Sequence, residues 1–578
     1  MLSLNDKDED QEEGLPLKPT QNDFVNEEEE ERIPRARSKR ARRAPKAVYD
    51  NDFEAHEIQN AIKASKVITN RCRTDGSDIP LAPIFYPTEE EFEDPIAYIC
   101  SIQSKAEAFG ICKIVPPDGY APNFNRACCF GEKSLVETKH QNVNRLQQGE
   151  SFPPGKTYVG LEKYKEMADT FEENYKEAHP ETFKDIKDED DLLKRIEDEY
   201  WRIVETNPNE AKAECGSLIQ TKNVNKKGEV LVEYGSDVDA RRFQSGFAAG
   251  ISGDPEDTEK HPWDMFELSK HPDNLLRFVD DDIPGLTTPW VYCGMLFATF
   301  CWHVEDHYLA SVNYAHKGSA KTWYGIPGSD AEKFEAIAKT AVPSLFKENP
   351  DKLHHITMLV PPGQLIENKI KIVKLVQKPG DFVVTFPRAY HSGFSHGFNV
   401  GEAVNFAPVD WIEMGRVACR NYVKGNGKRN AVFAHDRVVV TAAKSLKKIF
   451  ETTKSRGKWM AHMSRVLRTD LETLADELEN WQSILNGKQR GDGFIKGDPL
   501  RFYKCQNIPE MDGPEDCCVV CKAMPFAAVV RCECEFGRSF ARCLQHWNRG
   551  CDCKQRHRMV EMRMEVDELR ALAKSLEL

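Results

Sequence analysis

The sequence predicts an α+β protein with a central β-sandwich or barrel, helical segments on both sides of it, and a small metal-binding module. From residue 229 to about residue 410, short β-rich runs such as Val291 to Phe300 and Phe382 to Phe386 are bounded by Gly and Pro. Apolar residues recur at helical spacing before and after this region. Nine of the 18 cysteines lie between Cys505 and Cys553, and this clustering indicates metal binding rather than disulfides.

Length and composition bound the class of protein. With 578 residues, of which 40% are hydrophobic, the chain is long enough for two or three domains. No apolar run approaches the ~18 residues needed to cross a bilayer, and the acidic start of the chain is not a secretory signal. We therefore expect an intracellular protein. The net charge of -14 disfavours nonspecific wrapping around DNA by the whole chain but suits a basic peptide substrate.

The first 70 residues are charge-rich and poor in aromatic residues, which predicts a disordered tail. An acidic run from Glu27 to Glu31 precedes a basic run from Arg32 to Lys46, in which eight of fifteen residues are Lys or Arg. Such a run is typical of a nuclear import signal or a nucleic-acid contact. A merely solvated tail is the alternative.

Residues 79 to 88 predict an extended segment that leads into a helix over residues 89 to 108. Thr88 and Glu91 have the spacing of a capping box, and Asp94-Pro95 is expected to interrupt the first turn.

Four further segments are predicted to be helical. Residues 126–228 form a mostly helical connector, in which Trp201 and Ile203 are expected to pack against the next domain. Within the β-rich region one helix is expected near Ser329 to Val342. Residues 426–500 predict a helical domain, and residues 561–578 a C-terminal helix. A stripe of apolar residues in the helical domain is more typical of core packing than of a partner groove: Leu467, Leu471, Leu474, Leu478, Trp481 and Leu485.

Two fragments, around His303-Val304-Glu305 and His391, offer a metal two imidazoles and one carboxylate. That set is the facial triad of non-haem iron(II) oxygenases. In a strand, His303 and Glu305 would project from the same face, and His391 must come from a distant strand. A lone His-x-Glu also occurs in ordinary half-buried strands, so the context decides.

The surroundings of this triad favour 2-oxoglutarate as a co-substrate. Phe300 could pack on a bound ligand, while Asn313 and Lys321 follow closely in sequence. The distal carboxylate of 2-oxoglutarate needs a cation in the pocket, and a lysine supplies one. The alternative for Lys321 is an exposed lysine on a strand.

The segments that carry these residues closely resemble the JmjC domain of histone lysine demethylases: Met295 to His307, Asn313 to Gly328, Thr385 to Phe394 and Ala403 to Phe406. Residues 79–125 resemble the companion JmjN segment. The resemblance implies a double-stranded β-helix, a cupin-like jelly roll, as a catalytic domain over residues 229–425, with helical additions and a zinc module over residues 501–560. The similarity is closest to the branch that acts on lysine 4 of histone H3.

Carried over residue by residue, the resemblance implies that His303, Glu305 and His391 bind iron(II). It implies that Tyr234, Phe300, Asn313 and Lys321 hold 2-oxoglutarate, and that Tyr292 and Asn405 line the methyl-lysine pocket. A tyrosine face suits a methylated ammonium ion. Where the family commonly has Asn four residues after the second histidine, this chain has Ser395, which reaches less far. The placement of oxygen or substrate near iron is therefore expected to differ from that in the family.

The resemblance implies hydroxylation of an N-methyl group with O2 and 2-oxoglutarate, followed by release of formaldehyde. The expected partner is the methylated histone H3 tail or the nucleosome, in the nucleus and without a membrane. Two alternatives stay open: a protein hydroxylase of the same oxygenase class, which leaves a stable oxygen on carbon, and a weakly active chromatin scaffold.

The cysteine cluster supplies eight soft ligands, the number needed for two tetrahedral Zn(II) sites: Cys518, Cys521, Cys532, Cys534, Cys543, His546, Cys551 and Cys553. Their order resembles the zinc finger that follows JmjC in the same demethylase branch, and a disulfide knot is the alternative. The module could use zinc simply to fold and buttress the catalytic domain. Its basic residues also permit a weak DNA contact: Arg538, Arg542, Arg549, Lys554, Arg556 and Arg558. Cys505 and Cys517 are left over.

Overall fold

The computed structural model describes most of the chain after residue 78. The described residues are 79–120, 122, 135–206, 229–243, 245–247, 261–341, 357–424, 430–452, 458–487, 500–505, 516–534 and 540–577. All of them belong to one compact unit, Ser65–Leu578. The expected disordered tail and its basic run lie outside the described residues.

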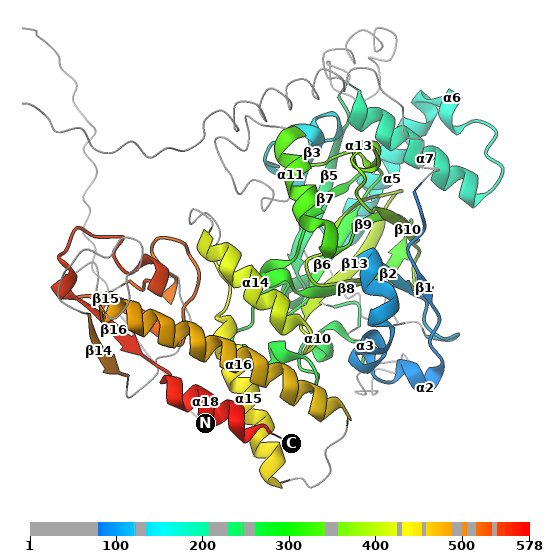
Figure 1. Cartoon of the computed structure of the whole chain (residues 1–578). Helices are drawn as coiled ribbons and strands as arrows, with labels where there is room; N and C mark the ends of the chain where they lie inside the picture. The colour runs from blue at the N-terminus through cyan, green and yellow to red at the C-terminus, as the bar shows by residue number, and fades with distance from the viewer. Residues whose placement is uncertain are drawn as a thin grey trace, which may run out of the picture. The chain divides into compact units, whose positions relative to one another are not determined.

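A nine-stranded sheet forms one side of the central domain (Figure 1). In spatial order its strands are β1 (Ile84–Phe85), β2 (Ile111–Ile114), β11 (Phe382–Thr385), β8 (Ala310–Gly318), β13 (Asn399–Phe406), β6 (Trp290–Gly294), β5 (Leu231–Asp239), β3 (Leu135–Asn142) and β4 (Pro154–Val159). Apart from the parallel pair β1 and β2, all these neighbours are antiparallel.

A four-stranded antiparallel sheet forms the other side, in the order β10 (Val373–Gln377), β9 (Lys321–Ile326), β12 (Tyr390–Ser395) and β7 (Thr299–His303). Side chains join the two sheets: Gln377 of β10 donates a hydrogen bond to Asn313 of β8. The expected β-sandwich is therefore confirmed. The single β-run expected over Val291 to Phe300 is two strands instead, because the chain passes from one sheet to the other between β6 and β7.

The N-terminal segment completes one edge of the large sheet. Helices α2 (Glu89–Phe92) and α3 (Pro95–Ala106) are separated at Asp94, and the capping box of Thr88 and Glu91 is present, as expected. At the entry to β2, Gly110 has φ +82°, and a Cβ there would lie 2.7 Å from the Ile326 carbonyl oxygen. Only glycine fits this approach of the segment to β9.

The region expected to be a mostly helical connector also supplies two strands. It contains α5 (Leu161–Ala178), α6 (Pro180–Phe183) and α7 (Glu189–Glu205), but β3 and β4 extend the large sheet beside β5. The strand β3 is rich in polar residues and buries only alternate side chains at its start. It therefore lacks the apolar, β-branched composition that predicts a strand from sequence. Trp201 of α7 is buried and donates a hydrogen bond to the Tyr324 hydroxyl of β9, as its expected packing requires.

The C-terminal part consists of helices and a small sheet. Helix α14 (Trp411–Lys424) leads to α15 (His435–Thr452) and α16 (Lys458–Leu485), whose stripe leucines are buried as expected. A three-stranded sheet has the order β14 (Arg501–Lys504), β16 (Arg558–Met562) and β15 (Ala528–Cys532). The last helix, α18 (Val566–Ser575), begins later than expected because the chain completes β16 first. Three short helices and α11 lie within the central domain: α9 (Ala240–Phe243), α10 (Met265–Leu268), α11 (Ala331–Ala341) and α13 (Pro362–Glu367).

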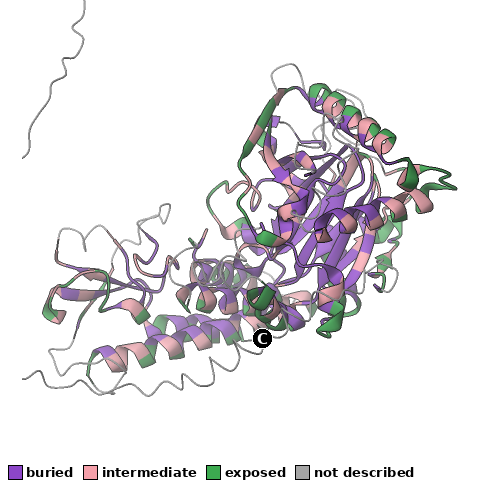
Figure 2. Cartoon of the chain, turned by 90° about the horizontal axis from the view of Figure 1, so that it is seen from above, coloured by how far each residue is buried: buried purple, intermediate pink, exposed green. Residues whose placement is uncertain are grey.

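Figure 2 shows that the strands are largely buried, whereas the helices expose their outer faces. Among the described helices, none combines the length and the apolar character required to span a membrane.

Gly393 is required by the pairing of β12 with its neighbours. An added Cβ would lie 2.1 Å from the Thr322 carbonyl oxygen in β9 and 2.5 Å from Cζ of Phe300 in β7. We predict that Gly393→Ala lowers the free energy of unfolding by about 1–3 kcal/mol, because backbone and ring must both shift. Urea denaturation measures this, and an unchanged midpoint would contradict the register described above.

Candidate functional site

The strand pairing brings the three expected metal ligands together. His391 of β12 lies directly opposite His303, the last residue of β7. Glu305 follows two residues after the strand has ended, but its backbone stays extended, with φ -64° and ψ 157°. One ligand atom from each of the three residues lies within 4.8 Å of the others. The sequence therefore identified a real cluster, although Glu305 is beyond the strand rather than in it.

Hydrogen bonds orient both imidazoles toward a metal. Nδ1 of His303 lies 2.8 Å from the Cys301 carbonyl oxygen, and Nδ1 of His391 lies 3.1 Å from that of Ala389. Because a carbonyl oxygen only accepts, each Nδ1 must donate its hydrogen. Each Nε2 then keeps a free lone pair, which is the arrangement that metal-binding histidines use.

Burial and charge set the protonation states that a divalent metal needs. Burial lowers the pKa of His303 to about 4. Burial by itself would raise the pKa of Glu305, but close contact with His391 and His303 outweighs it and lowers that pKa to about 2. At neutral pH His303 is thus neutral and Glu305 is a carboxylate. Two nitrogens and one oxygen on one side fit iron(II) with open coordination positions.

Helix α14 fixes the loop that follows Glu305. The Tyr422 hydroxyl donates to Oδ1 of Asp306 at 3.2 Å, and the Trp411 indole donates to the His307 carbonyl oxygen at 2.8 Å. His307 and Tyr308 both have a positive φ, 52° and 54°, which non-glycine residues rarely adopt. This strained turn is held by a helix more than a hundred residues away, and the sequence analysis had no signal for it.

Lys321 and Asn313 meet beside Gly401 at the other end of the site. A Cβ at Gly401 would lie 3.3 Å from the Lys321 ammonium nitrogen and 3.6 Å from Oδ1 of Asn313. Burial lowers the pKa of Lys321 to about 8, so it is a buried cation at neutral pH. The alternative of an exposed strand lysine is wrong, since Lys321 is only 4% exposed.

Gln377 is a further residue of the site that the sequence did not reveal. It is buried, donates to Oδ1 of Asn313 at 3.0 Å, and accepts a hydrogen bond from the Trp323 indole at 2.9 Å. Since Oδ1 of Asn313 is engaged, its amide NH2 group is the end left to donate to a ligand.

Tyr292 lies near both Lys321 and Glu305, and Tyr234 stacks on it. The rings of Tyr234 and Tyr292 stack at 6.4 Å, and the Lys321 ammonium lies 5.9 Å from the Tyr292 ring centre. Burial raises the pKa of both phenols well above the ordinary range. Both therefore stay neutral hydroxyl groups that can donate hydrogen bonds.

A change of register between β12 and β7 directs the Phe300 side chain toward the site. His391 pairs with His303, but Gly393 pairs with Phe300, so residues three apart in β7 share one face. Phe300 contacts the Trp323 ring at 4.6 Å. Its place beside a bound ligand stays a prediction.

Ser395 and Asn405 lie on opposite sheets. Ser395 is buried at the end of β12, directly opposite Lys321 in β9. Its hydroxyl lies where a Cβ at Gly294 would collide with it, at 2.5 Å. Asn405 of β13 donates to the Ala310 carbonyl oxygen and adds a hydrogen bond to Glu305 that favours the ionised carboxylate.

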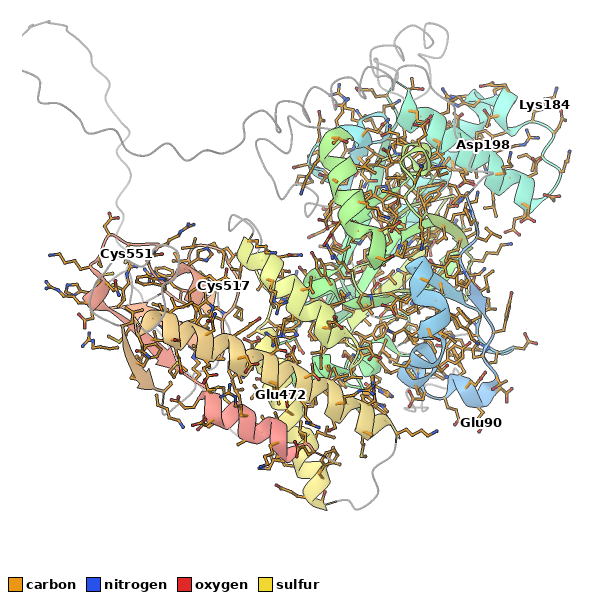
Figure 3. All side chains as sticks on the ribbon, in the orientation of Figure 1. Glu90, Lys184, Asp198, Glu472, Cys517 and Cys551 are labelled. Carbon is orange, nitrogen blue, oxygen red and sulfur yellow. The ribbon has the colours of Figure 1, made fainter. Side chains whose placement is uncertain are left out.

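The cysteine-rich module forms two clusters of four residues each. One contains Cys518, Cys521, Cys543 and His546, and the other contains Cys532, Cys534, Cys551 and Cys553. The ligand pairs thus alternate along the chain. Sγ atoms of Cys521 and Cys543 lie 3.7 Å apart, close to the ~3.8 Å edge of a tetrahedron with Zn–S bonds of about 2.3 Å. Cys517, labelled with Cys551 in Figure 3, is outside both clusters.

The first cluster lies against α14. Cys518, Cys521 and Cys543 belong to the same apolar core as Tyr422, and the Ala431 amide donates to the Lys522 carbonyl oxygen at 2.9 Å. The module thereby supports the helix that holds the Glu305 loop.

Two of the six basic residues expected to permit a DNA contact are buried. Arg542 is 0% and Arg558 3% exposed, and both donate to carbonyl oxygens inside the module. Arg549, Lys554 and Arg556 are exposed, and Arg538 lies outside the described residues.

Comparison with known families identifies three matching regions. Residues 290–406 match a family described as "JmjC domain, hydroxylase", residues 83–116 a "jmjN domain", and residues 518–572 a "C5HC2 zinc finger". The resemblance expected from the sequence is confirmed.

Curated relatives match most of this chain. Lysine-specific demethylase JMJ703 of Oryza sativa subsp. japonica is 33% identical over 597 residues, covering 93% of this chain and 44% of that protein. Lysine-specific demethylase JMJ706 of the same species is 34% identical, covering 86% and 53%. Putative lysine-specific demethylase JMJ16 of Arabidopsis thaliana is 30% identical, covering 92% and 46%. The chain spans about half the length of these relatives.

Removing the Tyr422 hydroxyl should weaken metal binding at the triad. Tyr422→Phe loses the hydrogen bond to Asp306, so the strained loop after Glu305 becomes less ordered. We predict an affinity for cobalt(II), followed by its absorption spectrum, that is up to about tenfold lower. Tyr503→Phe is the matched control, because that hydroxyl bonds Glu561 within the zinc module. Equal affinities for both variants would refute the tethering role.

Proposed function

We propose that this chain, which carries a JmjN domain, a JmjC domain and a C5HC2 zinc finger, is an iron(II)- and 2-oxoglutarate-dependent histone lysine demethylase. The observation that carries the proposal is the triad of His303, Glu305 and His391 beside a buried lysine. Both imidazoles direct Nε2 inward, and Lys321 supplies a cation within the same sandwich. The relatives' names, lysine-specific demethylases, agree with this reading.

The pocket suits a dicarboxylate co-substrate. Lys321 would pair with the distal carboxylate, and Asn313, oriented by Gln377, would donate its amide to the same molecule. Gly401 keeps this end open, since any side chain there would crowd Lys321. Phe300 would pack on the carbon chain of the ligand, and the Tyr234 hydroxyl would donate a further hydrogen bond.

Bound iron(II), with O2 and 2-oxoglutarate, would supply oxidation of a C–H bond to C–OH while 2-oxoglutarate becomes succinate and CO2. Hydroxylation at an N-methyl carbon gives a hemiaminal, which releases formaldehyde and leaves the amine with one methyl group fewer. The residues of the chain bind, orient and exclude water. Because the attacked atom is carbon, no nitrogen lone pair is needed, and trimethyl-lysine is an acceptable substrate.

A methylated ammonium ion fits the tyrosine-lined side of the pocket. Tyr292, stacked with Tyr234, would offer a ring face that attracts a large, weakly hydrated cation. Tyr292 and Asn405 would line the methyl-lysine pocket, with Ser395 nearby. The net charge of -14 suits a basic histone tail. The similarity of the triad segments to the branch that acts on lysine 4 of histone H3 supports that site, and a nuclear location follows from such a substrate.

Two zinc ions would hold the C-terminal module, one in each four-residue cluster. With so small an apolar core of its own, the module needs the metals to fold. Its contact with α14 gives it a structural role in the catalytic domain.

The function is tested by incubating the full chain with iron(II), 2-oxoglutarate and trimethylated H3 peptides, followed by mass spectrometry. We expect loss of successive methylene masses and release of formaldehyde at lysine 4. His303→Ala should abolish turnover, whereas His462→Ala, at a half-buried histidine of α16 that pairs with Asp410, should not. Gain of one oxygen mass without formaldehyde would favour a protein hydroxylase, and no mass change at any lysine would leave only a scaffold; either overturns the proposal.

The affinity for 2-oxoglutarate should fall in alkaline solution. Lys321 must be protonated to pair with a carboxylate, and its pKa in the free protein is about 8. Below that value the ammonium is present, and above it each pH unit removes up to about nine-tenths of the competent protein. We predict that KM for 2-oxoglutarate is constant near pH 7 and rises up to about tenfold per unit above pH 8. KM for a trimethylated peptide, which lacks this partner, is the control; a flat profile for 2-oxoglutarate would remove Lys321 from the role.

A further inference from the structure

A cavity remote from the triad in sequence opens between α15, α18 and the ends of β14 and β16. Its volume is about 590 Å³. Five basic and two acidic residues line it: Lys444, Lys447, Lys448, Lys504 and Arg563, with Glu451 and Glu568. Helices α15, α16 and α18 lie against one another beside it (Figure 1). We name it the basic groove.

Three of these lysines form a row on one helix. Lys444, Lys447 and Lys448 are spaced three and four residues apart in α15, so they share one face. All three are exposed, and Lys447 lies 3.9 Å from Glu451. From Lys444 to Lys458 the sequence has six Lys or Arg residues and one acidic residue. This stretch is strongly basic although the net charge of the whole chain is -14.

Arg563 adds an observation that a mere solvated helix face would not explain. It lines the groove, yet it is only 2% exposed, and neither Nη atom has a hydrogen-bond partner within the described part of the chain. Its Nε donates to Glu561 at 2.9 Å, and one Nη lies 4.0 Å from Asp516. Buried donors are normally satisfied. Arg563 therefore adds a buried guanidinium to the wall of the groove.

We propose that the basic groove binds the phosphodiester backbone of duplex DNA. Lys444 and Lys448 are about 6 Å apart along the helix axis. Two successive phosphate steps on one DNA strand span about 7 Å along the duplex axis, so the two spacings are similar. The lysines stand in a row along one open side, which fits a linear polyanion better than a compact one. Lys504, paired with Glu568, marks the opposite wall.

This contact differs from one made by the zinc clusters. The groove is formed by α15 and α18 with the three-stranded sheet, and none of its lining residues is a cluster ligand. The proposed DNA contact rests on the proposed function in one respect only: a histone tail substrate lies beside nucleosomal DNA. A groove that holds the backbone without reading bases would tether the enzyme near its substrate at any sequence.

The test compares two triple variants of the full chain. In the first, Lys444, Lys447 and Lys448 are replaced by Ala; in the control, the exposed helical residues Lys163, Lys194 and Lys339 are replaced, which changes the net charge equally. Fluorescence anisotropy of a labelled duplex of arbitrary sequence is measured over a range of salt concentrations. For the first variant we expect a Kd raised on the order of tenfold and a salt slope reduced by about 2 to 3, or about 0.9 per lost phosphate contact.

The basic run near the N-terminus is present in both variants, so their difference reports the groove alone. Equal DNA affinities would overturn the proposal. Saturable binding of inorganic tripolyphosphate that the first variant loses, without any change in DNA affinity, would also overturn it and assign a small-anion site. Demethylation of a free H3 peptide should be unchanged in both variants, so that assay tests the proposed function separately.

Discussion

The pairing of β12 with β7 places His391 opposite His303, and the rest of the site depends on this register. A shift of one residue would turn His391 to the other face of the sheet. Between Phe300 and His303, β7 has one residue more than the facing segment of β12. This bulge brings the Phe300 ring to the metal side. Gly393 permits both features, because a side chain there would collide with Phe300 and with the backbone of β9.

The site contains two buried groups of opposite charge, Lys321 and Glu305. Lys321 is a buried cation whose charge a bound carboxylate would neutralise. Glu305 is an anion close to two imidazoles. Each imidazole uses Nδ1 for a hydrogen bond, so its Nε2 lone pair is available to a metal. One end of the site therefore offers a cation to a carboxylate, and the other end offers ligand atoms to a metal. A ligand that bears a carboxylate at one end and chelates a metal at the other would satisfy both.

Support for the triad comes from distant parts of the chain. Helix α14 holds the turn after Glu305 through Trp411 and Tyr422, and the first cysteine cluster packs in the same core as Tyr422. The N-terminal segment closes the other side, where β2 pairs with β11 and Gly110 approaches β9. A zinc module and an N-terminal segment thus act on the metal site through packing, without contributing a ligand.

The sequence by itself identified the residues on which the proposed chemistry depends, since the identity and spacing of His303, Glu305, His391, Lys321 and the eight zinc-type ligands can be read without coordinates. It also determined the strongly periodic elements, such as the buried leucine stripe of α16. Only the tertiary structure decided the pairing of the cysteine ligands, the division of Val291 to Phe300 between two sheets, and the addition of β3 and β4. The roles of Gln377, Tyr422 and Arg563 emerged there too. These features depend on contacts between residues far apart in the chain, which local periodicity does not encode.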